Sequence, residues 1–225
     1  MENNVIPPDA SAALYFLPGQ YLFETFGENG HRLKALSSQQ VSRAFRDLRT
    51  DTGWLDRSVL RYCEAAYGNA MLSYLPAGSR NISVKCSDGV VRDITVPLPT
   101  LILLGKGRNY YLWATTARNV SEKTRLAVAP LPNIDDARIC FGKNEVPETH
   151  PSTLKRVWKL ILDTPFNGDN ATGKCQTGGD VRVLLTKLAE DKAKKFPTTQ
   201  LIVSTSTIGH AWEAIVGGQR YDRRF

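Results

Sequence analysis

The stretch TLILLGKGRNYYLWAT, residues 100–115, places two runs of aliphatic and aromatic residues on either side of a Gly-Lys-Gly-Arg-Asn connection. Such runs favour strands, and a short glycine-containing connection between them predicts a β-hairpin. A phosphate-binding loop is the alternative interpretation of Gly105-Lys106-Gly107. That loop needs a longer glycine spacing and a following helix, whereas the residues that follow are strand-like. We therefore take this hairpin as the centre of a sheet and work outward from it.

The flanking segments predict further strands first and then helices. Before the hairpin, we expect a hairpin at 14–17 and 21–26, a turn at Asn29-Gly30, a helix at 38–49, a weaker helix at 59–67 and a hairpin at 81–84 and 90–96. After it, we expect a strand at 126–129, an amphipathic helix at 153–162, a mobile loop at 167–180 and a helix at 181–195. Residues 201–212 fit either a late strand with a short helix or a docking tail. This order predicts an α+β fold, an antiparallel β-meander with helices packed on one side.

Length and composition predict a folded chain of two parts. With 225 residues, 42% of them hydrophobic, the chain can bury a substantial core. We expect an N-terminal hairpin-and-helix extension at 1–95 and a core with C-terminal helices and a tail at 96–225. No apolar run approaches the ~20 residues that span a bilayer, and the N-terminus lacks the features of a signal peptide. These features predict a soluble, cytoplasmic protein without a membrane partner.

The net charge of +7 is compatible with an acidic partner such as nucleic acid. The basic residues are scattered along the chain, however, and no long Lys/Arg block appears, so nucleic-acid binding is the lesser interpretation. The four cysteines lack a C-x-x-C spacing, and no cluster has metal-ligand spacing. We therefore expect free thiols and no metal site.

One cysteine stands out by its surroundings. The segment PLPNIDDARICFG, residues 130–142, places Cys140 a few positions after a Pro-Asn turn, near Arg138, whose positive charge favours a thiolate. The alternative is that residues 139–141 form a buried strand, because free cysteine is among the most buried residue types. Cys175, in the glycine-rich loop, is the only rival for an exposed reactive thiol, whereas Cys63 and Cys86 fit packing positions.

The same segment resembles the active site of ubiquitin-conjugating enzymes, in which a cysteine carries ubiquitin as a thioester. The run 124–142, preceded by Val96-Pro97-Leu98-Pro99 and followed by a Trp-bearing helix, is similar to the protein B family of the bacterial PRTRC plasmid-associated systems. That family is also described as prokaryotic family D of the ubiquitin-conjugating superfamily. The runs Leu60-Arg61-Tyr62-Cys63 and Leu75-Pro76-Ala77-Gly78 belong to the same resemblance. It implies a ubiquitin-conjugating-like core at 96–225 with an N-terminal α/β extension.

The resemblance also implies roles for three residues. Cys140 would be the nucleophile, Asn133 would steady the oxyanion or order the loop, and Asp169 would help to deprotonate an acceptor lysine. Capping of a helix-to-loop junction is the alternative role for Asp169. The chain departs from the family's His-Pro-Asn motif because Leu131 replaces the histidine and the spacing to the cysteine is about one residue shorter. Either His150 or a backbone contact substitutes for the histidine, or the site is degenerate.

The function that follows is a thioester carrier in a plasmid- or mobile-element-encoded system. The implied partners are a ThiF-type adenylating protein, a small ubiquitin-like protein and a JAB-type metallopeptidase that reverses the linkage. No bound cofactor is expected, since the ATP chemistry belongs to the activating partner. Two alternatives remain, a catalytically inactive adaptor of the same fold and a basic plasmid-maintenance protein that binds nucleic acid.

Overall fold

The chain divides into two compact units in a computed structural model, Met1–Trp54 and Leu55–Phe225. The structure describes residues 10–27, 30–46, 54–64, 68–86 and 88–217. The boundary expected between residues 95 and 96 differs from this division, since it falls within strand β7 (Val91–Leu98). That strand belongs to the second unit, which we call the core unit.

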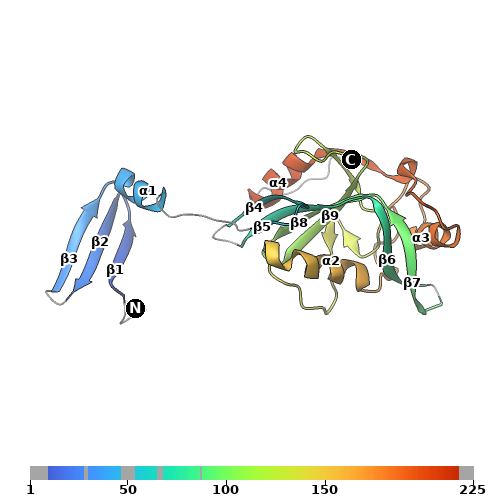
Figure 1. Ribbon diagram of the computed structural model, residues 1–225, viewed down its shortest axis with the longest axis horizontal. Coiled ribbons are helices and arrows are strands. Elements are labelled where there is room, and N and C mark those ends of the chain that lie inside the picture. The colour runs from blue at the N-terminus through green and yellow to red at the C-terminus, as the bar shows by residue number, and fades with distance from the viewer. Residues whose placement is uncertain (1–9, 28–29, 47–53, 65–67, 87, 218–225) are drawn as a thin grey trace. The chain divides into compact units, whose positions relative to one another are not determined.

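The first unit is a three-stranded antiparallel sheet followed by a helix (Figure 1). Its elements are β1 (Ala12–Leu17), β2 (Gln20–Gly27), β3 (Gly30–Leu36) and α1 (Ser38–Arg46). The predicted first hairpin is confirmed, and Gly19 has the positive φ that its tight turn requires. Ser37 and Gln40 form a capping box, in which Gln40 N donates to Ser37 Oγ at 3.2 Å and Ser37 N donates to Gln40 Oε1 at 2.9 Å. Asn29 and the predicted last residues of the helix, 47–49, lie outside the described residues.

The core unit is built around a mostly antiparallel sheet with the strand order β11-β12-β9-β8-β5-β4. Its strands are β4 (Val59–Cys63), β5 (Ala70–Leu75), β8 (Thr100–Lys106), β9 (Asn109–Thr115), β10 (Arg125–Val128), β11 (Ile134–Asp135), β12 (Arg138–Ile139) and β13 (Val203–Thr207). Strand β10 pairs with both β9 and β13. A separate hairpin joins β6 (Gly78–Lys85) to β7 (Val91–Leu98). Both hairpins predicted on either side of residue 99 are therefore confirmed.

The Gly-Lys-Gly segment lies in the β8–β9 hairpin, as predicted. The register runs from Thr100 opposite Thr115 to Lys106 opposite Asn109. Lys106 Nζ donates to the carbonyl of Ile215 at 2.9 Å, so it is directed at the end of a later helix. Gly105 is needed for close packing, because a Cβ there would lie 2.4 Å from Thr149 Oγ1. The phosphate-loop interpretation therefore does not hold.

Helices cover both faces of the central sheet, so the predicted one-sided packing is wrong. On one face, Leu101 and Leu103 pack in a cluster with α2 (Leu154–Asp163). On the other, Ile102 and Leu104 pack with Trp212 of α4 (Ile208–Val216). Figure 1 shows α2 and α4 on opposite sides of the strands. The unbroken apolar run of β8 is explained by this burial of both faces.

Strand β4 replaces the weaker helix predicted at 59–67. It pairs antiparallel with β5, with Tyr62 opposite Met71 and Cys63 opposite Ala70. Pairing with β5 decides between helix and strand for this short segment. Residues 65–67 of that prediction lie outside the described residues.

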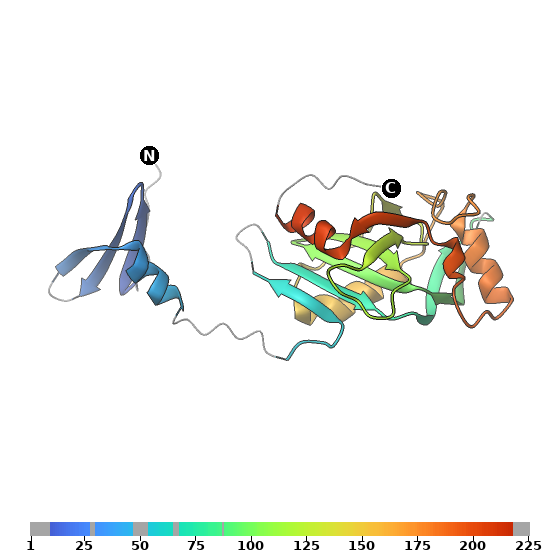
Figure 2. The ribbon, with the colours of Figure 1, turned by 90° about the horizontal axis from the view of Figure 1, so that it is seen from above.

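The C-terminal part contains a strand and a helix, which was one of the two interpretations of residues 201–212. Strand β13 leads directly into α4, whose N-terminus is capped by Thr207. Helix α3 (Val181–Glu190) lies at the end of the core unit opposite α4, and it ends five residues earlier than predicted (Figure 2). Short 3₁₀ segments occur at Pro151–Thr153 and Thr198–Gln200. Among the described residues, none of the helices combines the length and apolar character needed to cross a bilayer.

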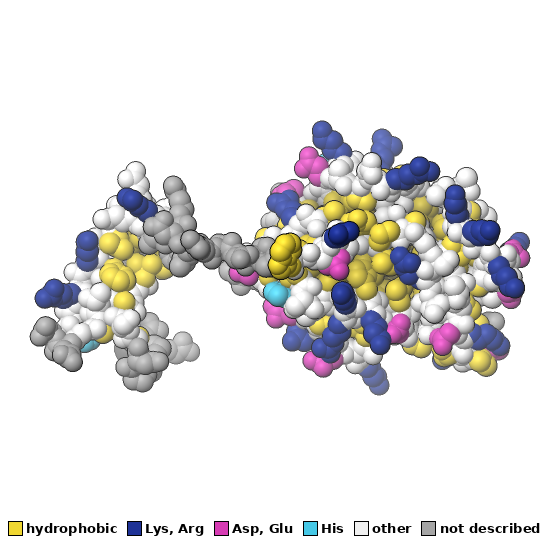
Figure 3. All heavy atoms as spheres, in the orientation of Figure 1, with side chains coloured by type: hydrophobic (Ala, Val, Ile, Leu, Met, Phe, Trp, Pro, Cys, Tyr) yellow, Lys and Arg dark blue, Asp and Glu magenta, His cyan; other side chains and the backbone are white. Residues whose placement is uncertain are grey.

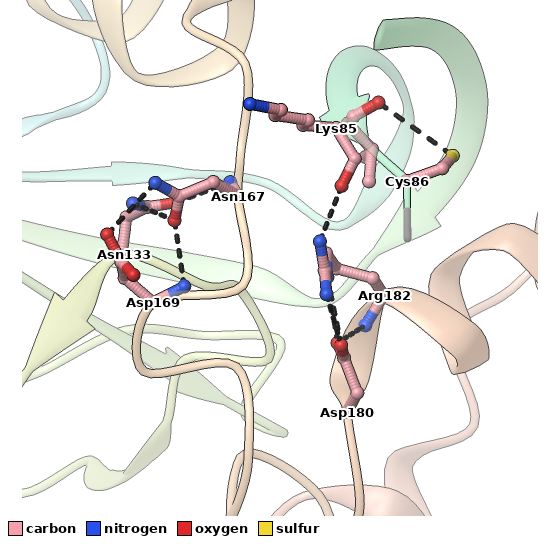
Figure 4. Close-up of polar contacts among 8 residues, drawn as sticks. Lys85, Cys86, Asn133, Asn167, Asp169, Asp180 and Arg182 are labelled. Atoms are coloured by element: carbon pink, nitrogen blue, oxygen red, sulfur yellow. Dashed lines mark hydrogen bonds and ion pairs between the residues drawn. The ribbon is translucent and has the colours of Figure 1, made fainter. Parts of the chain in front are cut away.

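Asp180 caps the N-terminus of α3 and pairs with Arg182, and Arg182 in turn connects the helix to the β6–β7 hairpin. Asp180 Oδ1 accepts from Arg182 N at 2.9 Å, and Asp180 Oδ2 accepts from Arg182 Nη2 at 2.6 Å. Arg182 Nη1 also donates to the carbonyl of Lys85 at 2.5 Å. Figure 4 shows this chain of contacts from the helix to the hairpin. Hydrogen bonds from Arg182 lower the pKa of Asp180, with burial opposing the shift.

Replacing Asp180 by alanine is expected to lower the free energy of unfolding by about 1 kcal/mol through loss of the helix cap. Asn is the matched control, since it keeps the capping oxygen and removes only the charge. Because the folded-state pKa of Asp180 is depressed, its charge stabilises the protein above the unfolded-state pKa of about 3.9 and the effect is lost as pH falls through the folded-state value. Urea unfolding of wild type and Asp180→Asn at pH 7 and at pH 3 measures this. A stability difference that persists undiminished at pH 3 would contradict the ion-pair account.

Candidate functional site

A short hairpin presents the cysteine predicted to be functional. Strands β11 and β12 pair through Ile134 opposite Ile139, and the two turn residues Asp136 and Ala137 have φ of 46° and 64°. Two successive positive φ values match the twist of a two-residue hairpin. Arg138 pairs with Tyr111 of β9, so the hairpin extends the central sheet at its edge. The chain leaves β12 directly into Cys140.

Cys140 is exposed, whereas its neighbour Phe141 is buried. The Phe141 ring packs edge-on against Tyr110 with the ring centroids 6.0 Å apart. Cys140 N donates to the carbonyl of Asn133 at 2.8 Å, which closes the base of the hairpin. The alternative of a buried thiol at this position is therefore not what the structure has. Arg138 is directed elsewhere, since its Nη2 donates to Asn109 Oδ1 at 2.7 Å.

The three residues proposed from the sequence line one cleft of about 180 Å³. Its walls come from β9, the hairpin and the turn after it, the last turns of α2 and the segment that follows α2. The lining residues are Leu112, Asn133, Ile134, Ile139, Cys140, Phe141, Gly142, Lys143, Asn144, Leu160, Ile161, Thr164, Pro165, Phe166, Asn167 and Asp169. The cleft is therefore lined by apolar side chains together with a thiol, amides, an amine and a carboxylate.

Hydrogen bonds between Asn133 and Asn167 connect the segment after α2 to the β11–β12 hairpin (Figure 4). We call this pair of bonds the asparagine clasp. Asn133 Nδ2 donates to Asn167 Oδ1 at 2.8 Å, and Asn167 N donates to Asn133 Oδ1 at 2.9 Å. Asn133 N donates to the carbonyl of Asp169 at 2.8 Å. Asn133 has a φ of 59°, a conformation that asparagine tolerates better than most residues. Through these contacts Asn133 holds the loop in place. Its Nδ2 has a second hydrogen that can be donated to another acceptor.

Asn167 lines the cleft as well, and no role was predicted for it from the sequence. Its Oδ1 also accepts from Asp169 N at 2.8 Å, and its Nδ2 donates to Asp169 Oδ2 at 2.9 Å. It therefore fixes both the Asn133 side chain and the Asp169 carboxylate. The Asn-Gly-Asp sequence at 167–169 is typical of a side-chain-stabilised turn, and that was the available signal. Asp163, the last residue of α2, pairs with Lys159 at 3.9 Å on the exposed side of the helix.

The loop at 167–180 packs against the hairpin rather than standing clear of it. Lys174 is 7% exposed, and its Nζ donates to the carbonyl of Ile134 at 2.6 Å. Burial lowers the pKa of Lys174, and the Asp135 carboxylate opposes part of this shift. Cys175 is only 2% exposed. The loop is thus held by buried contacts, and the interpretation of Cys175 as an exposed rival thiol is wrong.

Among the described residues, no histidine lines the cleft of Cys140. Leu131 is completely buried in the main core cluster. His150 accepts from Ser152 N at 3.2 Å, its ring packs against Tyr62, and it is not among the residues that line the cleft. Apolar packing therefore fills the position at which the resemblance predicts a histidine, and the Cys140–Asn133 backbone bond and the Asn133–Asn167 hydrogen bonds hold the loop.

Thiol labelling is expected to rank the four cysteines by exposure. Cys140 should react fastest, Cys63 and Cys86, which are half-buried, more slowly, and Cys175 slower than Cys140 by roughly 100-fold or more, because it reacts only through opening of the structure. Maleimide labelling at neutral pH, with each site quantified by peptide mass spectrometry, measures the order. Labelling in urea should abolish the differences. Native labelling of Cys175 as fast as Cys140 would contradict the packing described for the loop.

A family model described as prokaryotic E2 family D matches residues 32–204, which is more than half of the chain. The chain belongs to this family. Membership of prokaryotic E2 family D suggests a ubiquitin-conjugation-like role and implies ubiquitin-like and activating proteins as partners in general. The matched region contains Asn133, Cys140, Asn167 and Asp169. No curated protein and no solved structure matched the chain in the other two comparisons.

Proposed function

We propose that this member of prokaryotic E2 family D carries a ubiquitin-like protein as a thioester on Cys140. A ThiF-type adenylating protein would load it, and a JAB-type metallopeptidase would reverse the final linkage. The core unit would be a ubiquitin-conjugating-like domain, and the protein would be protein B of a PRTRC system encoded by a plasmid or mobile element. The observation that carries this proposal is the single cleft in which an exposed thiol, the Asn133 amide and the Asp169 carboxylate meet.

The chemistry assigns each group a step. The Cys140 thiolate attacks the activated C-terminal carbonyl of the modifier and forms a tetrahedral oxyanion, whose collapse to the thioester expels the activating group. The resulting oxyanion would be met by the second amide hydrogen of Asn133, whose orientation the clasp fixes. In the transfer step an acceptor amine attacks the thioester, its proton passes to Asp169 or to water, and the thiolate leaves. Asp169 Oδ2 is already anchored by Asn167, which keeps the carboxylate at the cleft wall.

The test is a loading reaction with the purified chain, a ThiF-type protein, a ubiquitin-like protein and ATP. The expected product is a covalent adduct that forms only with ATP, disappears with dithiothreitol and maps to Cys140 by peptide mass spectrometry. An adduct on any other residue would reject the site assignment. Binding of the modifier without any adduct would favour the inactive-adaptor alternative, which the replacement of the motif histidine by Leu131 motivates.

Nucleic-acid binding remains the alternative motivated by the charge of +7. On the face of the core unit seen in Figure 3, Lys and Arg side chains are dispersed among acidic ones rather than gathered in one patch. This distribution gives a weak electrostatic footprint. The alternative predicts DNA affinity whose logarithm falls steeply and linearly with the logarithm of salt concentration. Filter binding of DNA over a series of salt concentrations tests this alternative, and weak binding without that slope would reject it.

A further inference from the structure

We propose that Lys143 is an internal acceptor, so that an acyl group carried on Cys140 can pass to Lys143 Nζ of the same chain. This inference rests on the proposed thioester function and names one acceptor for it. It would make the protein a substrate of its own site, with a stable amide as the product.

The backbone brings the two side chains to the same cleft. Asn144 N donates to the carbonyl of Phe141 at 3.1 Å, so the chain reverses between Cys140 and Asn144. Gly142, with a φ of 59°, allows this turn. Cys140 and Lys143 are both exposed and both line the cleft. Three residues of chain span at most about 11 Å even when extended, and lysine carries its amine on a flexible four-carbon stem.

The transfer from Cys140 to Lys143 needs no group from another chain once Cys140 carries the acyl group. Among the described residues, no carboxylate forms an ion pair with Lys143. In the transfer, neutral Nζ attacks the thioester carbonyl, a C–N bond forms, the C–S bond breaks and Cys140 leaves as a thiolate. The proton released from Nζ goes to the Asp169 carboxylate, which lines the same cleft, or to water.

A small acyl donor tests the geometry without any protein partner. The full chain is incubated with the N-acetylglycine thioester of 2-mercaptoethanesulfonate, and acylated peptides are quantified before and after hydroxylamine treatment. The expected result is a hydroxylamine-sensitive group on Cys140 that gives way to a resistant amide on Lys143. Cys140→Ala should lower acylation of Lys143 at least about tenfold, because the intramolecular step provides a high effective concentration. Lys143→Arg should leave the acyl group on Cys140.

A matched control is Lys159→Arg, because Lys159 lies on the exposed side of α2 and does not line the cleft. This variant should transfer the acyl group to Lys143 as wild type does. Three results would overturn the inference: unchanged acylation of Lys143 in Cys140→Ala, loss of the group from Cys140 by hydrolysis alone, or no acylation of Cys140. Each can be read with circular dichroism as a check that the variant is folded.

The inference and the proposed function can fail separately. If the loading reaction gives a reductant-sensitive adduct on Cys140 but no reductant-resistant product on Lys143, the function stands and the internal acceptor is wrong. If the small thioester passes from Cys140 to Lys143 but no modifier protein is ever loaded, the geometry is right and the proposed function is wrong.

Discussion

Changing Cys140 to serine is expected to turn the reductant-sensitive adduct into one that dithiothreitol leaves intact and alkali removes. A serine at this position would hold the modifier as an oxygen ester, which thiols exchange far less readily than a thioester. Loading should also slow by at least about tenfold, equivalent to about 1.4 kcal/mol in activation free energy, since a hydroxyl is a weaker nucleophile than a thiolate. Non-reducing and reducing gels of the loading reaction, with an alkaline wash, measure both effects.

The matched control is Cys86→Ser, because Cys86 is also a free thiol of the core unit and lies outside the cleft of Cys140. Its contact is weak, with Sγ 4.0 Å from the carbonyl of Val84. This variant should load as wild type and give an adduct that dithiothreitol removes. If Cys140→Ser still gave a dithiothreitol-sensitive adduct, the thioester would have to be on another cysteine.

The local pattern of the chain was sufficient for most strands and helices but not for their arrangement. The β8–β9 hairpin and α2 were predicted because turn glycines and helical periodicity act over a few residues. The placement of α4 opposite α2 was missed. The continuous apolar run of β8 indicated burial of both faces, but it does not say which later helix covers the second face.

Strand β4 shows the limit of local propensity. Residues 59–63 contain apolar and polar positions that fit a helix or a strand equally well over so short a length. Their strand form depends on β5, which supplies the pairing partner. The pairing partner becomes a neighbour only when the chain folds, so a short window of sequence does not reveal it.

The site was predicted in part for a similar reason. The structure brings Asn133, Cys140 and Asp169 to one cleft, although their catalytic roles remain predictions. The loop that supplies Asp169 was expected to be mobile because it is rich in Gly, Asn, Asp and Thr. Its order comes from Lys174 reaching the Ile134 carbonyl, and from the burial of Cys175. Neither feature can be recognised from the composition of residues 167–180.

Replacing Leu131 by alanine is expected to lower the free energy of unfolding by about 2–5 kcal/mol, the usual cost of a large cavity in a packed core. Leu131 has no exposed surface and lies two residues before Asn133. Urea unfolding followed by tryptophan fluorescence measures the loss. Leu131→Met, which conserves volume, is the control and should cost less than about 1.5 kcal/mol.

Leu131→His tests what this position does in the site. An imidazole here would supply the histidine that the resemblance to ubiquitin-conjugating enzymes predicts. It would also enter a core cluster and lose its hydration, so we expect destabilisation rather than gain of activity. The cavity of Leu131→Ala should also loosen the segment that carries Asn133, and Cys140 should lose loading activity even under conditions where the variant is folded. If Leu131→His were as stable as wild type and loaded faster, the expectation would be wrong. The site would then accept a polar side chain at residue 131, and the imidazole would hold the loop. Normal loading by Leu131→Met together with weak loading by Leu131→His would instead show that apolar packing of residue 131 in the core is what the site requires.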